Sequence, residues 1–182
     1  MKSARYLDTV PAARPLLADD ILEFHAARLL LLFRICGTAN RIDGLTKMAK
    51  LDFFVRYPDF FARACRTEGF QCDNLYRVIE SSMIRFHYGP WDQRYYHILA
   101  YIESKGLIRV TRVNKGFQLR LTEAGKARAN RLQENSHYDD LCRHMKSVKR
   151  AFGKRTGSSL KTLIYRIFDE EVGQLGLGEV ID

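Results

Sequence analysis

The sequence predicts a mainly α-helical protein with a small antiparallel β-wing, and three observations support this fold class. Residues 106–129, GLIRVTRVNKGFQLRLTEAGKARA, place two runs of alternating side chains around the turn residues Asn114-Lys115-Gly116, as in a β-hairpin. A helical pattern precedes this hairpin, and another follows it directly. Residues 21–69 contain three helical patterns with short connections. Together these features predict a winged helix-turn-helix protein, with room for two tandem helix-turn-helix lobes and further C-terminal helices.

The chain is expected to divide into four segments. These are an N-terminal arm (1–18), a helical lobe of helix-turn-helix type (19–80), a winged-helix lobe (81–134) and a C-terminal helical extension (135–182). The arm carries Pro11 and Pro15 and shows no sustained period, which indicates an extended segment.

The first lobe is predicted to contain three helices. The first, ILEFHAARLLLLFRIC, begins after a cap at Asp19 or Asp20, ends at Gly37, and is apolar on most faces, so we expect it to be central and buried. Asp43 is expected to cap the second helix, which must end near Tyr57 because Pro58 follows. The third helix, DFFARACRTEG, is expected to stop at its glycine, and any wing after it is expected to be reduced.

The second lobe begins with NLYRVIESSMIRF, whose pattern fits either a helix or a strand. Gly89-Pro90 predicts a break, and Asp92 is a candidate cap for a helix that Gly106 ends. Trp91 and the neighbouring tyrosines fit either a core anchor for this helix or a platform that stacks on bases. After the hairpin, Thr122 is predicted to cap the next helix.

The tail is predicted to form two more helices, YDDLCRHMKSVKRAF and SSLKTLIYRIFDEEV. Apolar residues of the second helix recur at helical spacing, which predicts a face that packs either on its own domain or on a partner. The candidate partner-interface residues are Leu160, Leu163, Ile164, Ile167 and Phe168.

The net charge of +9 is concentrated between Arg109 and Arg155, where 13 Lys and Arg face 4 Asp and Glu. Such a block can attract phosphate, or it can be a solvated face or a surface that meets an acidic protein. The candidate DNA- or phosphate-contacting residues are Arg109, Arg112, Lys115, Arg120, Lys126, Arg128, Arg131, Lys146, Lys149 and Arg150.

Sequence patterns predict no catalytic, cofactor-binding or metal-binding residues. FGKRTGSS lacks the glycine and the Ser or Thr that a phosphate-binding loop needs. The acids beside His137 fit a helix start better than a metal site. No two of the four cysteines, Cys36, Cys65, Cys72 and Cys142, are spaced as C-x-x-C, so we expect buried thiols in a reducing compartment.

The chain is also expected to be cytoplasmic and to have no membrane partner. Its apolar runs are far shorter than the roughly 20 residues that span a bilayer. The N-terminus carries no secretory signal pattern.

Three stretches in order, RIDGLTKMAKLDFFVRYP, HYGPWDQRYYHILAYIESKGLI and the exit LTEAGKARA, resemble middle components of bacterial ABC-three-component defence systems of the Lamassu type. The resemblance covers roughly residues 20–133. It implies a non-enzymatic winged-helix subunit that assembles with an SMC-like or ABC-type ATPase and an effector, often a nuclease, against phage or plasmid DNA. It carries over no catalytic residues.

Two functions therefore remain open. The first is this accessory subunit, which contacts double-stranded DNA through its basic face as a second duty. The alternative is a dimeric winged-helix transcription regulator, with a recognition helix in the major groove and Arg112, Lys115 and Arg120 on phosphates. Neither DQRYYHILAYIESK nor DFFARACRTE carries a clean array of Arg, Asn and Gln for base edges, which favours the subunit.

Overall fold

The computed structural model describes residues 21–72, 83–87, 89–114 and 116–181, without the side chain of residue 86. Lys115, the expected arm, Asp19, Asp20 and most of the ambiguous segment before Met83 lie outside these residues. The N-cap position of the first helix is Ile21, which has no side-chain cap, so the expected cap at Asp19 or Asp20 is wrong.

The described chain is mainly helical and carries a small antiparallel sheet, as predicted. In chain order the elements are α1 (Leu22–Ile35), β1 (Arg41–Asp43), α2 (Leu45–Arg56), α3 (Pro58–Glu68), β2 (Ile84–Phe86), β3 (Gly89–Trp91), α4 (Tyr95–Ser104), β4 (Ile108–Val113), β5 (Gly116–Leu121), α5 (Glu123–Gln133), the short 3-10 helix η3 (Ser136–Tyr138), α6 (Asp139–Phe152), α7 (Gly157–Ile167) and the π-helical turn η4 (Asp169–Gly173).

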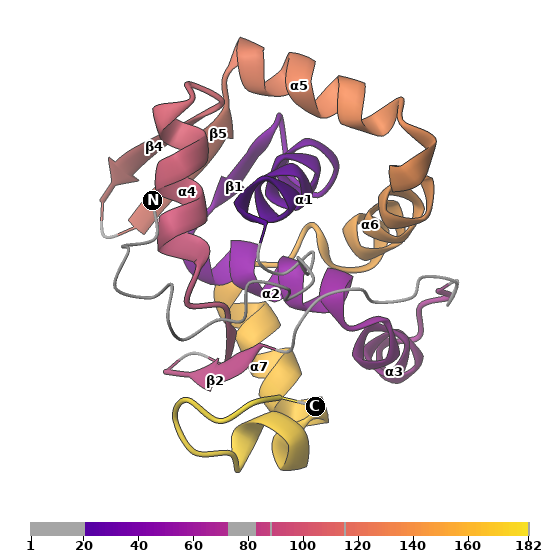
Figure 1. Cartoon of the computed structure of the whole chain (residues 1–182). Helices are drawn as coiled ribbons and strands as arrows, with labels where there is room; N and C mark the ends of the chain where they lie inside the picture. The colour runs from indigo at the N-terminus through magenta and orange to yellow at the C-terminus, as the bar shows by residue number, and fades with distance from the viewer. Residues whose placement is uncertain (1–20, 73–82, 88, 115, 182) are drawn as a thin grey trace, which may run out of the picture.

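Helices α1 and α2 form the centre of the molecule. In Figure 1, α1 is seen nearly end-on with α4, α5, α6 and α2 around it. Residues 28–33 of α1 and all residues of α2 from Met48 to Arg56 are buried. This confirms the prediction of a central first helix. The buried apolar residues form one cluster that runs from Ala26 to Ile181, so the segments on both sides of residues 80 and 134 share a core.

The main sheet has the strand order β1-β5-β4, so the first strand pairs with the last. Its inner face buries Ile42, Ile108, Leu119 and Leu121 against the helices. The predicted hairpin is confirmed as β4 and β5, and Asn114 in its turn has φ 53. Strand β1 was not predicted: Asp43 lies in it, and Gly44 occupies the cap position of α2, so the expected Asp43 cap is wrong.

The helix that leaves the hairpin is locked to the end of α4. The Thr122 hydroxyl accepts from the backbone N–H of Gly125 (3.0 Å) and donates to the carbonyl of Gly106 (2.6 Å). A Cβ at Gly125 would lie 1.9 Å from the Leu107 carbonyl oxygen, so only glycine fits there. The predicted Thr122 cap is confirmed, and the LTEAG pattern has a packing reason.

The C-terminal helices α6 and α7 pack on α2 and α3 and complete the core. Phe168 packs on Phe60 with ring centroids 4.7 Å apart, and Phe152 of α6 packs on Phe54 at the same distance. Leu160, Leu163, Ile164 and Phe168 are all buried, whereas Ile167 is half-buried. The stripe therefore packs on its own domain, which is one of the two alternatives that its spacing left open, and four of the five candidate partner-interface residues lie in the core.

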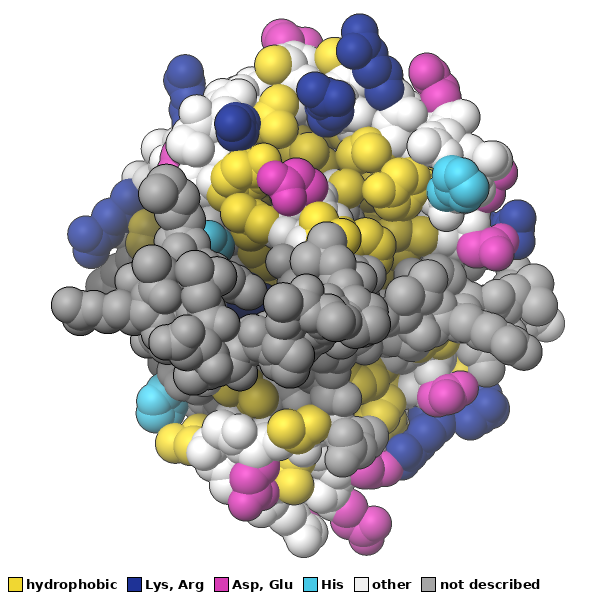
Figure 2. Space-filling view, in the orientation of Figure 1, with side chains coloured by type: hydrophobic (Ala, Val, Ile, Leu, Met, Phe, Trp, Pro, Cys, Tyr) yellow, Lys and Arg dark blue, Asp and Glu magenta, His cyan; other side chains and the backbone are white. Residues whose placement is uncertain are grey.

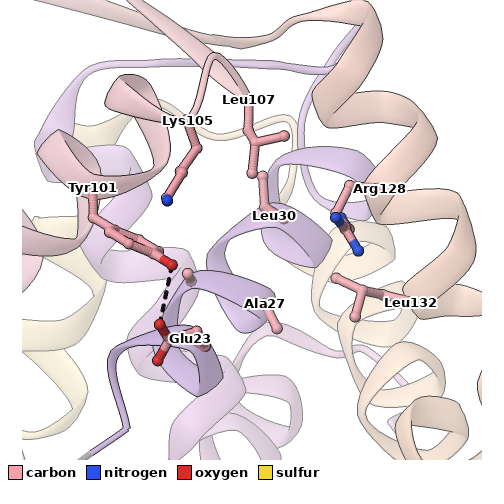
Figure 3. A pocket seen from close by; sticks show the side chains of 9 residues that line it. Glu23, Ala27, Leu30, Tyr101, Lys105, Leu107, Arg128 and Leu132 are labelled. Carbon is pink, nitrogen blue, oxygen red and sulfur yellow. Dashed lines mark hydrogen bonds between the residues drawn. The ribbon is translucent and has the colours of Figure 1, made fainter.

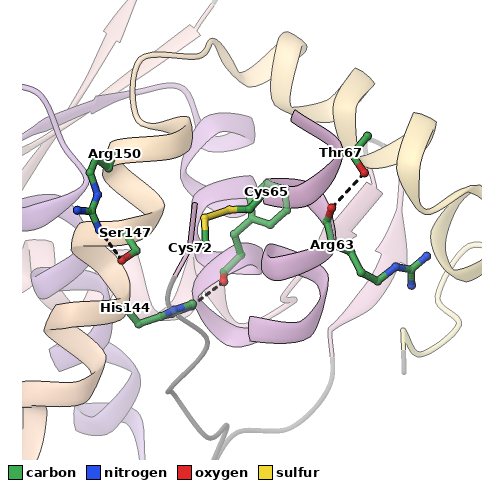
Figure 4. The surroundings of a disulfide bond; sticks show 8 residues. Arg63, Cys65, Thr67, Cys72, His144, Ser147 and Arg150 are labelled. Carbon is green, nitrogen blue, oxygen red and sulfur yellow. Dashed lines mark hydrogen bonds between the residues drawn. A yellow bond between two sulfur atoms is a disulfide. The ribbon is translucent and has the colours of Figure 1, made fainter. Parts of the chain in front are cut away.

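Two further expectations need correction. Gly89 and Pro90 lie inside β3, which pairs with β2, instead of forming a break. Cys65 and Cys72 form a disulfide (Figure 4). Helix α3 ends at Gly69 with φ 73, and this left-handed residue turns the chain back so that the two Cα atoms lie 6.3 Å apart. Cys36 and Cys142 are buried free thiols, as expected.

Candidate nucleic-acid interface

The outer face of the main sheet carries three arginines side by side. Arg41, Arg120 and Arg109 are direct cross-strand partners on β1, β5 and β4, and we call them the arginine row. The neighbouring residues along each strand point into the core, so the row faces away from it. Arg109 and Arg120 are exposed, and the side chain of Arg41 is 33% exposed.

The row is electrostatically unfavourable unless an anion joins it. Like charges directly opposite each other on a sheet are destabilising. The Nε of Arg41 lies 3.0 Å from the Asp43 carboxylate, which offsets one charge. Within the described residues, no acidic side chain pairs with Arg109 or Arg120. The geometry therefore provides a platform of guanidinium groups that a chain of phosphates can neutralise.

The hairpin tip adds one cation and two apolar side chains. Arg112 is exposed but belongs to the opposite face of the hairpin from the row, because it pairs with Phe117 across the strands. Val113 and Phe117 are 46% and 45% exposed. Lys115, at the turn, lies outside the described residues.

The basic residues predicted on α5 do not share one face. Lys126 forms an ion pair with Glu123 (2.6 Å), on the side where Asn130 accepts from Arg34 (2.9 Å). Arg128 instead lines a pocket between α1, α4 and α5. Arg131 is exposed on the same side of the helix as Arg128.

On α6 the structure separates surface cations from a structural one. Lys146 and Arg150 are exposed. The Lys149 ammonium donates to the carbonyls of Cys36 (2.8 Å) and Gly37 (2.7 Å), at the C-terminal end of α1. It therefore caps that helix, and its ammonium is engaged within the fold.

Neither expected recognition helix presents base-reading side chains. The exposed residues of α4 include Tyr96, His97 and Ala100, while Glu103 accepts from the backbone of Val110 (2.8 Å). Trp91 packs edge-on against Tyr95 with centroids 5.1 Å apart, so it anchors the start of α4. On α3, Arg63 pairs with Glu171 and lies over the Phe168 ring.

A buried network of charges fixes α4 to α1 and α2, and no sequence pattern had indicated it. Asp52 of α2 accepts from Arg28 Nε (2.9 Å) and from the Tyr95 hydroxyl (2.7 Å). Burial, together with the charge of Asp52, raises the pKa of Tyr95 well above its usual range, so the hydroxyl keeps its proton. His25 Nδ1 lies 3.1 Å from Arg28.

A second part of the network surrounds Asp92, just before α4. Its carboxylate accepts from Arg56 (2.7 Å) and from the backbone and side chain of Arg94. Burial raises the pKa of Asp92, but the hydrogen bonds from Arg94 and the charge of Arg56 outweigh it and hold the pKa below its usual range. Asp92 thus joins α4 to α2, two residues before the cap position, which Arg94 occupies.

Figure 2 shows how the surface is divided on one face. Lys and Arg side chains lie around its upper part with a patch of apolar side chains among them, and acidic side chains are interspersed over both the upper and the lower parts. Over the described residues, no group of three or more His, Cys, Asp and Glu side chains is placed to hold a metal ion. None of the helices in the described segments is long and apolar enough to cross a membrane.

No protein-family model matches the chain, and searches of curated proteins and of solved structures find no significant match.

Proposed function

We propose that the chain is a non-catalytic winged-helix accessory subunit that touches DNA through the arginine row. It assembles with an SMC-like or ABC-type ATPase and a nuclease-like effector in a bacterial defence complex against phage or plasmid DNA. The arginine row is the observation that carries the DNA-binding part. The assembly part rests on the resemblance of the three quoted stretches.

The order of elements supports the winged-helix part of this proposal. α1, β1, α2, α4, β4 and β5 follow one another as helix, strand, helix, helix and hairpin, and β5 lies between β1 and β4. In this proposal β4 and β5 form the wing, and α3 with the β2–β3 hairpin is an insertion before the third helix.

The same geometry favours binding without sequence preference. Guanidinium groups in a row across strands contact phosphates, which position a protein on DNA and carry no direct sequence information. The helix before the wing offers an aromatic, a histidine and an alanine to solvent instead of an array of Arg, Asn and Gln. A dimeric regulator also needs a surface for its second copy, and the apolar stripe of α7 is buried in its own domain and offers none.

Replacing Arg109 and Arg120 together by Gln is expected to weaken binding to random-sequence duplex DNA at least tenfold at about 0.1 M salt. Because two phosphate contacts are lost, the slope of log affinity against log salt should fall by about 2. Fluorescence anisotropy over a salt series measures both quantities.

The matched control is Arg66→Gln with Arg166→Gln, which removes the same charge from α3 and α7, far from the hairpin in Figure 1. It should leave the slope nearly unchanged. Equal losses in the two double variants would show that only net charge matters and would remove the arginine row from the proposal. A preference of about 10³-fold or more for one sequence would instead support the regulator.

The assembly part predicts that the tagged chain, expressed from its native locus, co-purifies with an ATPase encoded beside it. The complex should survive about 1 M salt, where surface ion pairs are screened, because a stable subunit interface is mainly apolar. Mass spectrometry of the purified complex identifies the partner. Recovery of the chain alone, in the same wash that keeps a known ATPase complex intact, would rule out this assembly.

A further inference from the structure

A pocket of about 500 Å³ opens between α1, α4 and α5 and is separate from the arginine row. Its apolar lining comes from Ala26, Ala27, Leu30, Leu107 and Leu132. The two alanines leave space that a larger side chain on α1 would fill. This volume lies within the range of sites that hold one small molecule, and such sites combine an apolar lining with a few placed polar groups.

Two cations reach into this pocket from opposite sides. In Figure 3, Lys105 extends from the end of α4 and Arg128 from α5, and the two side chains lie on opposite sides of Leu30. No carboxylate among the described residues pairs with either of them. The Lys105 ammonium lies over the face of the Tyr101 ring, 5.5 Å from its centroid. The pocket is therefore lined by two cations that form no ion pair among the described residues.

The negative charge in the pocket is already engaged. The Tyr101 hydroxyl donates to the Glu23 carboxylate at 3.1 Å, at the end of the pocket away from Leu107. This bond raises the pKa of Tyr101. The pocket is thus polarised, with a basic end between Lys105 and Arg128, an apolar middle, and an acidic end at Glu23.

We propose that this pocket binds an amphipathic anion, a small molecule with a carboxylate and an apolar body. The carboxylate lies between Lys105 and Arg128, and the apolar body lies on Ala27, Leu30 and Leu132. This assigns Arg128 to a ligand site, although its sequence neighbours suggested a DNA contact. The inference goes beyond the proposed function, because neither the arginine row nor an ATPase partner is needed for it.

Dodecanoate, used below its micelle concentration, is the probe. Isothermal titration calorimetry on the full chain should show saturable binding with one site. Lys105→Glu with Arg128→Glu should weaken this binding at least about tenfold, because two attractive contacts become repulsive. Ala27→Trp, which fills the apolar middle, should abolish it. Dodecyltrimethylammonium, with the same body and the opposite charge, should bind more weakly than dodecanoate to the wild type.

Arg66→Glu is the matched control, since it reverses an exposed charge on α3, which contributes no residue to the pocket. The affinity of this variant should stay within about twofold of wild type. Thermal unfolding checks that each variant is folded. The proposal would be overturned if dodecanoate showed no saturable binding to the wild type. Equal binding by the Ala27→Trp variant, by the charge-reversed variant, or by dodecyltrimethylammonium would also overturn it. Because Ala27→Trp leaves the arginine row intact, its DNA binding should not change, so this proposal and the DNA proposal fail separately.

Discussion

Replacing Asp52 by Asn is expected to lower the free energy of unfolding by about 3–5 kcal/mol, the usual cost of removing one partner from a buried ion pair. Asp52 is 0% exposed and Arg28 1% exposed, so the arginine would keep its charge in the core after losing its carboxylate partner. The Tyr95 hydroxyl would also lose a charged acceptor at 2.7 Å. Urea denaturation followed by circular dichroism measures the change. A loss of this size is a large share of the stability of an ordinary domain.

The matched control is Asp140→Asn, at an exposed carboxylate that pairs with Arg143 one helical turn away. It should change stability by less than about 0.5 kcal/mol, because exposed ion pairs contribute little. Adding Arg28→Met to Asp52→Asn should restore part of the loss, since the buried charge that has lost the Asp52 carboxylate disappears. If the double variant is as unstable as the sum of the two single variants, the two charges are not coupled and this account is wrong.

Local patterns in the sequence were enough to predict most helices and the hairpin. Pro58 and Thr122 mark the starts of α3 and α5, and α1, α3 and α4 end within two residues before a glycine. The hairpin follows from side-chain alternation around Asn114. These signals can be seen in the sequence because each residue restricts the backbone conformation of its immediate neighbours.

Features that depend on distant partners were missed. Strand β1 is only three residues long and exists because β5, more than 70 residues later, offers its edge. Asp43 was therefore interpreted as a helix cap. The buried pairs of Asp52 and Asp92 join residues 24 and 36 positions apart, and a sequence shows no sign of such pairing.

The candidate site was predicted only in part. The charge block pointed to Arg109 and Arg120, but Arg41, which completes the row, lies outside that block and is placed by strand pairing. Lys149 and Arg128 belong to the same block, but Lys149 caps α1 and Arg128 lines the pocket between α1, α4 and α5. The helix face on which each residue lies depends on packing. Composition locates a basic region, whereas topology decides which of its side chains act together.

Replacing Lys50 is expected to change how stability depends on pH, because this lysine is 0% exposed in the centre of α2. Its ammonium donates to the Pro90 carbonyl (2.8 Å), and no acidic side chain is among the groups that shift its pKa. Burial, and to a smaller extent the charge of Lys161, lower the pKa of Lys50 from 10.5 to about 7. In the unfolded chain the pKa returns to its ordinary value, so between pH 7 and 10.5 the unfolded state binds one proton more. Stability therefore rises with pH in this window, and Lys50 destabilises the fold most below pH 7.

Lys50→Met removes this titration while filling much the same space. The free energy of unfolding of the variant minus that of the wild type should decrease by roughly 3–4 kcal/mol between pH 6 and pH 10, because the wild type gains stability that the variant cannot gain. Taking the difference cancels groups that titrate in both proteins, such as Tyr95 and Lys149. At pH 6 the variant should be the more stable protein, although the Pro90 carbonyl loses its donor, which offsets about 1 kcal/mol. Lys146→Met, at an exposed position of α6, should give a difference that does not change with pH. A flat difference for Lys50→Met as well would mean that the buried amine titrates as it does in water, and that polar surroundings compensate its charge.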